Sequence, residues 1–97
     1  MIEIRTFRLR AGVDPERFST LVTSVQTGVY YQQPGFVRQT IGRSGDTWLI
    51  LTSWASPEAA ERDLPVPPTK SVASDVEALH ASIEAGSERL ERYVGLD

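Results

Sequence analysis

The sequence predicts an α+β domain of the ferredoxin-like type, a split βαβ arrangement with a four-stranded antiparallel sheet. Two strand-like segments flank a turn at Ser44-Gly45-Asp46 in the middle of the chain. A stretch with apolar residues at helical spacing precedes this hairpin, and another follows it. Strand-like segments open and close the chain. The predicted order is therefore strand, helix, strand, strand, interrupted helix, strand.

The central hairpin is predicted to pair a strand from Phe36 to Arg43 with one from Thr47 to Trp54, after a stop at Pro34-Gly35. The second strand has two faces, one with Trp48, Ile50, Thr52 and Trp54 and the other with Leu49, Leu51 and Ser53. Both faces are largely apolar, so we expect helices on one side of the sheet and a second molecule on the other. An identical subunit is the simplest cover, which predicts a homodimer.

The first half of the chain is predicted to form a strand and a long helix. Along the strand from Met1 to Arg10, the apolar residues alternate between faces, with Ile2 and Ile4 on one and Phe7 and Leu9 on the other. This alternation is interrupted near Arg5-Thr6, so either the strand has a bulge there or both of its faces are buried. Asp14 and Pro15 form a helix start, and we expect that helix to run to about Gln33.

After the hairpin, Ser56-Pro57-Glu58 starts a short helix, and a proline-rich loop from Leu64 to Thr69 follows as a lid or a stiff connector. The next helix is predicted to begin at the capping box from Ser74 to Glu77, with Thr69 as an earlier alternative, and to end at Gly86. The last strand is predicted from Ser87 to Val94.

Composition limits the function classes. The 97 residues fit one domain, 1–97. A net charge of −3 without a basic stripe argues against nucleic acid, and the longest apolar run, Trp48 to Leu51, is too short to cross a membrane. The strand-like start does not resemble a signal peptide. The absence of cysteine excludes disulfides and thiolate catalysis and fits a cytoplasmic location.

The candidate catalytic residues are His80, Trp54 and Arg38. His80 is the only histidine, beside the apolar stripe of its helix, where it is either a general base or a structural residue. Arg38 shares a face with Phe36 in the predicted strand. If it points inward it stabilises an enolate or phenolate, and otherwise it lies in solvent or at the dimer interface. Glu77, His80 and Glu84 share one side of a helix, but with one histidine they form a weak ligand set, so no metal site is expected.

Aromatic residues are abundant for a domain of this size, and bulky aromatic walls suit a flat aromatic ligand. The candidate substrate-binding residues are Tyr30, Tyr31, Trp48 and Phe7, with core packing or a dimer interface as the alternative roles. The expected partner of the domain, besides a second copy, is therefore a small aromatic molecule.

The chain resembles the dimeric α/β-barrel superfamily, most closely its antibiotic biosynthesis monooxygenase type. The matching residues are Pro34-Gly35-Phe36, the turn at Gly45-Asp46, Trp54 with Ser56-Pro57-Glu58-Ala59-Ala60, and the opening Ile4-Arg5-Thr6-Phe7 with Gly12-Val13-Asp14. Trp54 stands where the oxygenases resembled carry a tryptophan, whereas the asparagine expected before it is absent and Ile50 stands in that region. The chain has no asparagine and no tryptophan after residue 54, which argues against haem degradation.

The resemblance implies a cofactor-independent monooxygenase that acts on an aromatic, polyketide-like small molecule in secondary metabolism. Two alternatives remain, because the fold alone does not specify an activity. One is a cyclase or isomerase that uses the same pocket without oxygen. The other is a non-catalytic dimeric binding or accessory protein.

Overall fold

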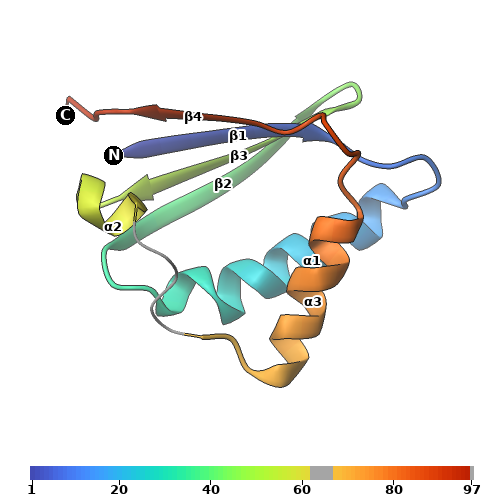
Figure 1. The fold of residues 1–97 in the computed structure, drawn as a ribbon, viewed down its shortest axis with the longest axis horizontal. Helices are drawn as coiled ribbons and strands as arrows, with labels where there is room; N and C mark the ends of the chain where they lie inside the picture. Colours follow the sequence, from blue (N-terminus) through green and yellow to red (C-terminus); the bar gives the residue numbers. More distant parts are fainter. Residues whose placement is uncertain (62–66, 97) are drawn as a thin grey trace.

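The computed structural model describes residues 1–61 and 67–96 of the chain. In chain order the elements are β1 (Ile2–Arg8), α1 (Pro15–Gly28), the 3₁₀ helix η1 (Tyr30–Gln32), β2 (Phe36–Ser44), β3 (Thr47–Trp54), α2 (Pro57–Glu61), α3 (Lys70–Ala81) and β4 (Arg89–Tyr93). The strands form an antiparallel sheet in the order β2-β3-β1-β4 (Figure 1). The predicted fold class, a ferredoxin-like α+β domain, is confirmed.

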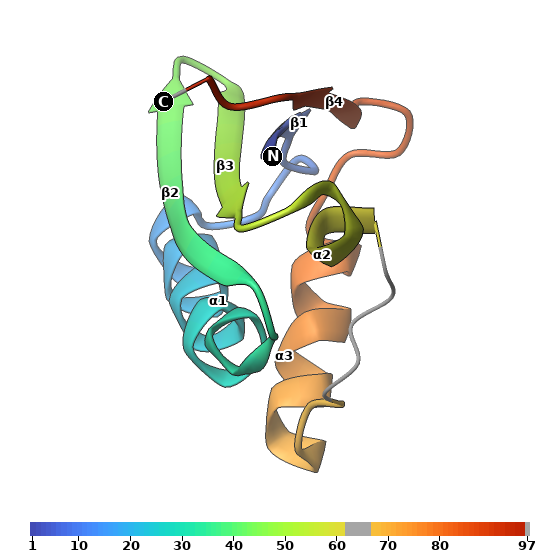
Figure 2. The ribbon, with the colours of Figure 1, turned by 90° about the vertical axis from the view of Figure 1, so that its left-hand side faces the viewer.

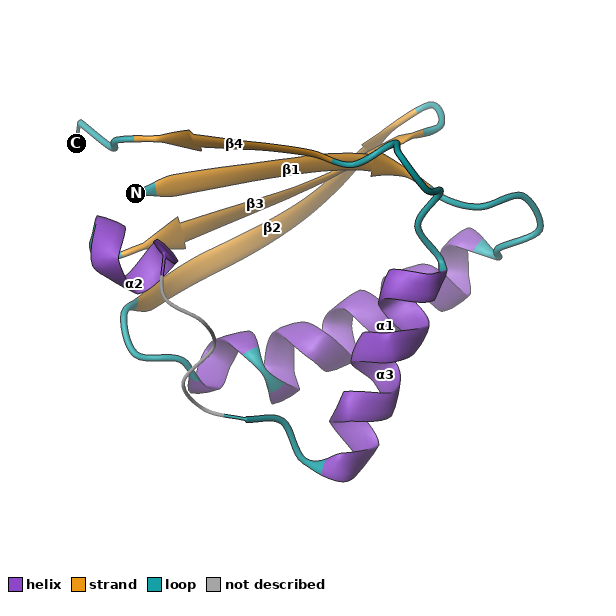
Figure 3. Ribbon diagram, viewed as in Figure 1, coloured by secondary structure: helices purple, strands orange, loops and turns teal. Residues whose placement is uncertain are grey.

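The helices and the sheet form two layers. Figure 3 shows the helices on one side of the sheet, and Figure 2 shows α1 and α3 side by side beneath it. None of the described helices covers the opposite face of the sheet. The helix-covered face predicted from the hairpin is thus confirmed, and the second molecule on the other face stays a prediction. None of the helices in the described part of the chain is long and apolar enough to span a bilayer.

The main core lies between the sheet and α1, where three aromatic rings stack edge to face. The Phe18 ring centroid lies 5.6 Å from that of Phe7 on β1 and 5.1 Å from that of Trp48 on β3. All three side chains are buried. Burying a side chain of this size stabilises the fold by about 1.5–3 kcal/mol, so these contacts fix α1 on the sheet.

Helix α1 begins as predicted and ends earlier than predicted. The Asp14 side chain accepts a hydrogen bond of 3.2 Å from the Glu16 amide, and Pro15 follows the cap. The helix stops at Gly28 instead of about Gln33, because Val29 leaves helical geometry (φ −120°, ψ −64°) and the chain continues as η1. Glycine has low helix propensity, which favours a break here. The break reorients Tyr30, which follows it.

Helix α3 starts at Lys70 with Thr69 at its N-cap, so the capping box predicted at Ser74 is wrong and the earlier alternative start at Thr69 is confirmed. Asp75 of that box has another role, because its carboxylate accepts a 2.5 Å hydrogen bond from the Ser24 hydroxyl of α1. The bond joins the two helices side by side. Residues 64–66 of the proline-rich loop predicted from Leu64 to Thr69 lie outside the described residues.

The C-terminal end of α3 is set by β1 rather than by Gly86. Ile83 pairs with Leu9 in an isolated antiparallel bridge, and the Glu84 amide donates a 2.8 Å hydrogen bond to the Arg8 carbonyl. These bonds need extended backbone, so the helix ends at Ala81 and the predicted stop at Gly86 is wrong. The segment after α3 is thereby held against the end of β1.

Candidate active site

A cavity of about 360 Å³ lies between the helix-facing side of the sheet and the two long helices; we call it the inner cavity. Its apolar wall includes Phe7, Val25, Ile50 and Leu79. Its polar lining comes from the sheet, from η1, from α2 and from α3, and consists of Glu3, Arg5, Tyr30, Gln39, Thr52, Glu61, His80 and Arg92. A mostly apolar cavity with a few convergent polar groups is the usual form of a small-molecule site.

Glu3 joins two sides of the inner cavity. Its Oε1 atom accepts a 2.7 Å hydrogen bond from Nε1 of Trp54, and its Oε2 atom accepts a 2.9 Å bond from Nε of Arg92. The Glu3 side chain is only 14 % exposed. The bond fixes the Trp54 ring, and it occupies the indole N–H, which is therefore not free to bond a ligand. Trp54 serves as a fixed wall of the cavity.

Arg5 brings a guanidinium into the inner cavity from β1. Its Nη1 atom forms a 2.7 Å ion pair with Glu88, and the two side chains are 38 % and 42 % exposed. A guanidinium carries five donors, and the pair with Glu88 uses one of them. The remaining donors are available for an oxyanion in the cavity.

Tyr30 contributes a hydroxyl that stays protonated at neutral pH. Burial raises its pKa above the ordinary value of 10.0, and the nearby Arg5 guanidinium offsets part of this rise. Its ring packs against Trp54 and Phe36, with centroid distances of 6.3 Å and 6.2 Å. The early end of α1 places this residue on η1, where it lines the cavity.

Arg38 does not line the inner cavity, which corrects the sequence-based expectation. The pairing of β2 with β3 shifts between Phe36 and Arg38, so Val37 is an extra residue in a bulge. Beyond the bulge, Arg38 lies opposite Ser53 and Gln39 lies opposite Thr52. The bulge therefore turns Arg38 to the helix-free face and leaves it exposed.

Gln39 takes the inward position instead. Its Nε2 atom donates a 3.0 Å hydrogen bond to the Thr52 hydroxyl, and both residues line the inner cavity. The backbone carbonyl of Gln39 accepts a 3.0 Å bond from the Gln26 side chain of α1, which holds this part of β2 against the helix.

His80 lies in the last turn of α3, exposed, and lines both the inner cavity and a neighbouring one. It therefore stands at the mouth of the inner cavity. Glu84, the nearby carboxylate of the weak ligand set considered above, is bonded to Arg8. Among the described residues there is no group of three His, Cys, Asp or Glu side chains that could hold a metal ion.

Of the predicted aromatic residues, Phe7, Tyr30 and Trp54 line the inner cavity, and Trp48 and Tyr31 do not. Trp48 is buried in the core against Phe18, with the Arg43 guanidinium 5.3 Å from its ring centroid. Tyr31 is 56 % exposed. The structure thus brings together three of the five aromatic candidates with His80.

Glu3, Arg5, Gln39 and Thr52 were not predicted as site residues. The signal for two of them was present in the sequence, because Glu3 and Arg5 are an even number of residues from Phe7 and so share its face of β1. The interruption of the alternation near Arg5 is therefore not caused by a bulge, since β1 pairs with both β3 and β4 without a shift in register. It reflects polar residues that face a cavity.

The sequence matches no protein-family model, and no curated protein matches it. Solved structures do match. A point mutant of SnoaB, a cofactor-independent oxygenase from Streptomyces nogalater, aligns with a TM-score of 0.74 at 19 % identity, over 99 % of this chain and 92 % of that one. A protein provisionally assigned as an antibiotic biosynthesis monooxygenase, from Caulobacter crescentus CB15, aligns with a TM-score of 0.73 at 16 % identity, over 99 % and 89 %.

The protein At3g17210 from Arabidopsis thaliana aligns equally well, with a TM-score of 0.74 at 13 % identity, over 99 % of this chain and 95 % of that one. At such low identities the similarity establishes the fold. The chain has the fold of antibiotic biosynthesis monooxygenase-like proteins over its whole length, which confirms the resemblance read from the sequence.

Proposed function

We propose that the chain is a cofactor-independent monooxygenase that oxidises a flat aromatic, polyketide-like molecule. The observation that carries this proposal is the inner cavity, which combines Arg5, Tyr30 and His80 with a mainly apolar lining. The similarity in fold to SnoaB supports it. An apolar cavity favours a flat aromatic ligand, and the polar groups provide the proton acceptor and the donors that such a reaction needs.

The reaction is written here for an anthrone, an electron-rich substrate that can itself reduce oxygen. Loss of a C–H proton gives an enolate, which transfers one electron to O₂ to give a substrate radical and superoxide. These combine into a C–O bond, and the resulting hydroperoxide loses water to leave a quinone carbonyl. One oxygen atom enters the product and the other leaves as water, so the substrate supplies all four electrons.

In this proposal His80 accepts the substrate proton at the cavity mouth. Arg5 and the protonated Tyr30 hydroxyl donate hydrogen bonds to the enolate oxygen, and Arg5 takes the role that the sequence assigned to Arg38. Trp54, held by Glu3, is a wall for the ring system. The apolar part of the lining limits the water that surrounds the reactive anion.

The test is oxygen uptake with an anthrone, compared with the uncatalysed oxidation. We expect uptake to rise with protein concentration, with one O₂ consumed per quinone formed. His80→Ala is expected to lower kcat by about 10²-fold or more, and the control Arg17→Gln, on the exposed side of α1, to have no effect. A rate independent of added protein would contradict the proposal, and turnover without oxygen would indicate a cyclase or isomerase.

We further propose that the active form is a homodimer joined through the helix-free face of the sheet. This face carries Ile4 opposite Leu51, and Thr6 opposite Leu49, at the centre of the sheet. A second copy would cover these side chains, three of which are aliphatic, since two-fold symmetry brings the same patch of each subunit together.

A further inference from the structure

A second cavity, of about 330 Å³, adjoins the inner cavity; we call it the outer cavity. The two share Arg5, His80 and Ile83 in their linings. The rest of the outer lining comes from Arg10, after β1, and from the segment between α3 and β4. The two cavities therefore adjoin at the three shared residues.

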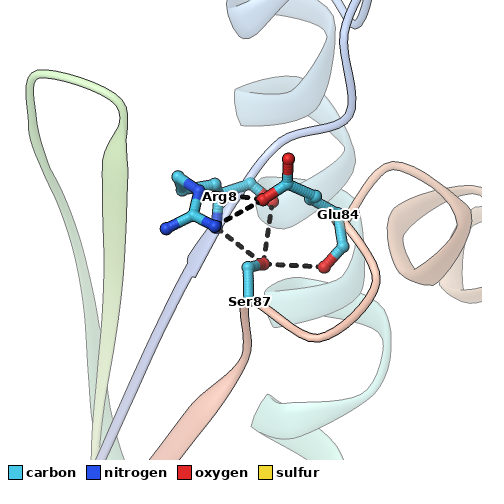
Figure 4. Close-up of polar contacts among 3 residues, drawn as sticks. All are labelled: Arg8, Glu84 and Ser87. Atoms are coloured by element: carbon cyan, nitrogen blue, oxygen red, sulfur yellow. Dashed lines mark hydrogen bonds and ion pairs between the residues drawn. The ribbon is translucent and has the colours of Figure 1, made fainter.

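The walls of the outer cavity are held by hydrogen bonds. Figure 4 shows that Arg8 contacts both Glu84 and Ser87, with an Arg8 Nη2 to Glu84 Oε2 distance of 2.7 Å and a bond of 3.1 Å from the Arg8 amide to Ser87 Oγ. The Arg10 amide donates a 2.8 Å bond to the Ser82 carbonyl. The backbone positions of Arg10 and of the opposite wall are therefore fixed before any ligand arrives.

The charges around the outer cavity leave one cation without a partner. Glu84 is paired with Arg8 at 2.7 Å, and Glu88 with Arg5 at 2.7 Å. Within residues 1–61 and 67–96 the Arg10 guanidinium has no ion pair or hydrogen bond. A planar guanidinium binds a carboxylate through two parallel hydrogen bonds. The outer cavity thus offers an unpaired carboxylate-binding group beside the mouth of the inner cavity.

We propose that the outer cavity binds the carboxylate of an elongated aromatic acid, with Arg10 as its partner, while the aromatic rings occupy the inner cavity. The inference rests on the proposed function and narrows its substrate class to aromatic compounds that carry a carboxylate on a short chain. Arg10 is a specificity residue in this scheme. It does not touch the reacting atoms.

The test compares two ligands with the same ring system and chain by isothermal titration calorimetry at low salt. One is the charged 4-(1-hydroxynaphthalen-2-yl)butanoate and the other is its neutral methyl ester. We expect the acid to bind the wild-type chain about fivefold more tightly than the ester, as for one solvent-accessible ion pair. Arg10→Gln should abolish this preference without changing the affinity for the ester. Arg17→Gln, at an exposed arginine that lines neither cavity, should retain it.

Equal binding of acid and ester, or a preference that survives Arg10→Gln, would overturn the outer subsite while the proposed function stands. A preference lost equally in Arg17→Gln would reflect net charge and would overturn it as well. Binding of neither ligand would overturn both proposals. Thermal melts of the two variants, expected to match wild type, show that each is folded.

Discussion

Nε1 of Trp54 donates a 2.7 Å hydrogen bond to Oε1 of Glu3, across 51 residues of sequence. The same carboxylate accepts from Arg92, so one side chain connects the ends of β1, β3 and β4. Both the tryptophan and the carboxylate line the inner cavity. The shape of the proposed site therefore depends on this contact.

Glu3→Ala is expected to lower the free energy of unfolding by about 1–3 kcal/mol, because it leaves the partly buried indole N–H without an acceptor. Glu3→Gln keeps one acceptor oxygen for the indole N–H and loses the charge and the second acceptor, so its effect should be smaller. Urea denaturation followed by tryptophan fluorescence measures both. Glu77→Ala, at an exposed carboxylate on α3, is the control, and an equally stable Glu3→Ala variant would contradict the expectation.

Gly28→Ala is expected to destabilise the packing of α1 on α3. A Cβ atom at Gly28 would lie 2.7 Å and 2.9 Å from the two methyl carbons of Val72. Overpacking of this kind costs about 1–3 kcal/mol, offset by up to about 1 kcal/mol of helix propensity. The net loss should shrink in a Val72→Ala background, which a double-mutant cycle measures.

Gly42→Ala is the matched control, because a Cβ atom there would meet nothing within 4 Å. It should leave the free energy of unfolding unchanged or raise it slightly, since glycine weakens a strand. If Gly28→Ala changed the free energy of unfolding as little as Gly42→Ala does, the close approach of α1 and α3 would not require glycine at position 28.

Tyr30 makes stability depend on pH at the alkaline end. Burial raises the pKa of the folded Tyr30 above the ordinary value of 10.0. Between these two pKa values the folded state holds more protons than the unfolded one, so stability is full below pH 10.0 and falls as pH rises through the folded pKa. Tyr30→Phe should flatten the decline in melting temperature above about pH 9.5.

The comparison of Tyr30→Phe with wild type isolates the effect of this one hydroxyl, because the other tyrosines are present in both proteins. Tyr31→Phe, at an exposed hydroxyl, serves as the control for loss of a tyrosine. If Tyr30→Phe and wild type lost stability in parallel up to the highest pH measured, the Tyr30 hydroxyl would not be buried as the structure shows.

The order of elements was predictable because it depends on local patterns. Alternation along β3 and the Asp14-Pro15 start of α1 are set by neighbouring residues. The ends of α3 were not predictable in this way. Its start lacks a side-chain cap, and its end follows from the pairing of Ile83 with Leu9, residues 74 positions apart that no helix signal connects.

The site was only partly predictable for a related reason. Period-two alternation assigned Arg38 to the face of Phe36, and one extra residue at Val37 reverses every position after it. Nothing in the sequence near Val37 marks the bulge. For Arg5 the error was of the opposite kind. The strand alternates regularly there and places Arg5 on the face of Phe7, but a charged residue on that face was interpreted as a break in the alternation.

The helix-free face gives a prediction for assembly. Leu51 lies at the middle of β3, opposite both Ile4 and Thr40, on that face. If a second copy covers it, Leu51→Arg buries an unpaired charge, which costs about 3–5 kcal/mol and raises the dimer dissociation constant at least about a hundredfold. Sedimentation velocity measures this, with Thr20→Arg on α1 as control. A wild-type monomer at micromolar concentration would contradict the homodimer.

The role of stabilising the enolate oxygen is assigned to Arg38 by the sequence and to Arg5 by the structure, and a comparison of variants at the two positions distinguishes these assignments. Arg5 lines the inner cavity and Arg38 lies on the other face of the sheet. If an arginine stabilises the enolate oxygen, Arg5→Gln should lower kcat for anthrone oxidation by about 10²-fold, the usual cost of losing one such donor. Arg38→Gln should leave kcat unchanged. The two proteins are compared at concentrations at which sedimentation shows that the variant has the same oligomeric state as wild type. Steady-state oxygen uptake measures both variants. Loss of kcat in Arg38→Gln alone would mean that β2 pairs with β3 without the bulge at Val37.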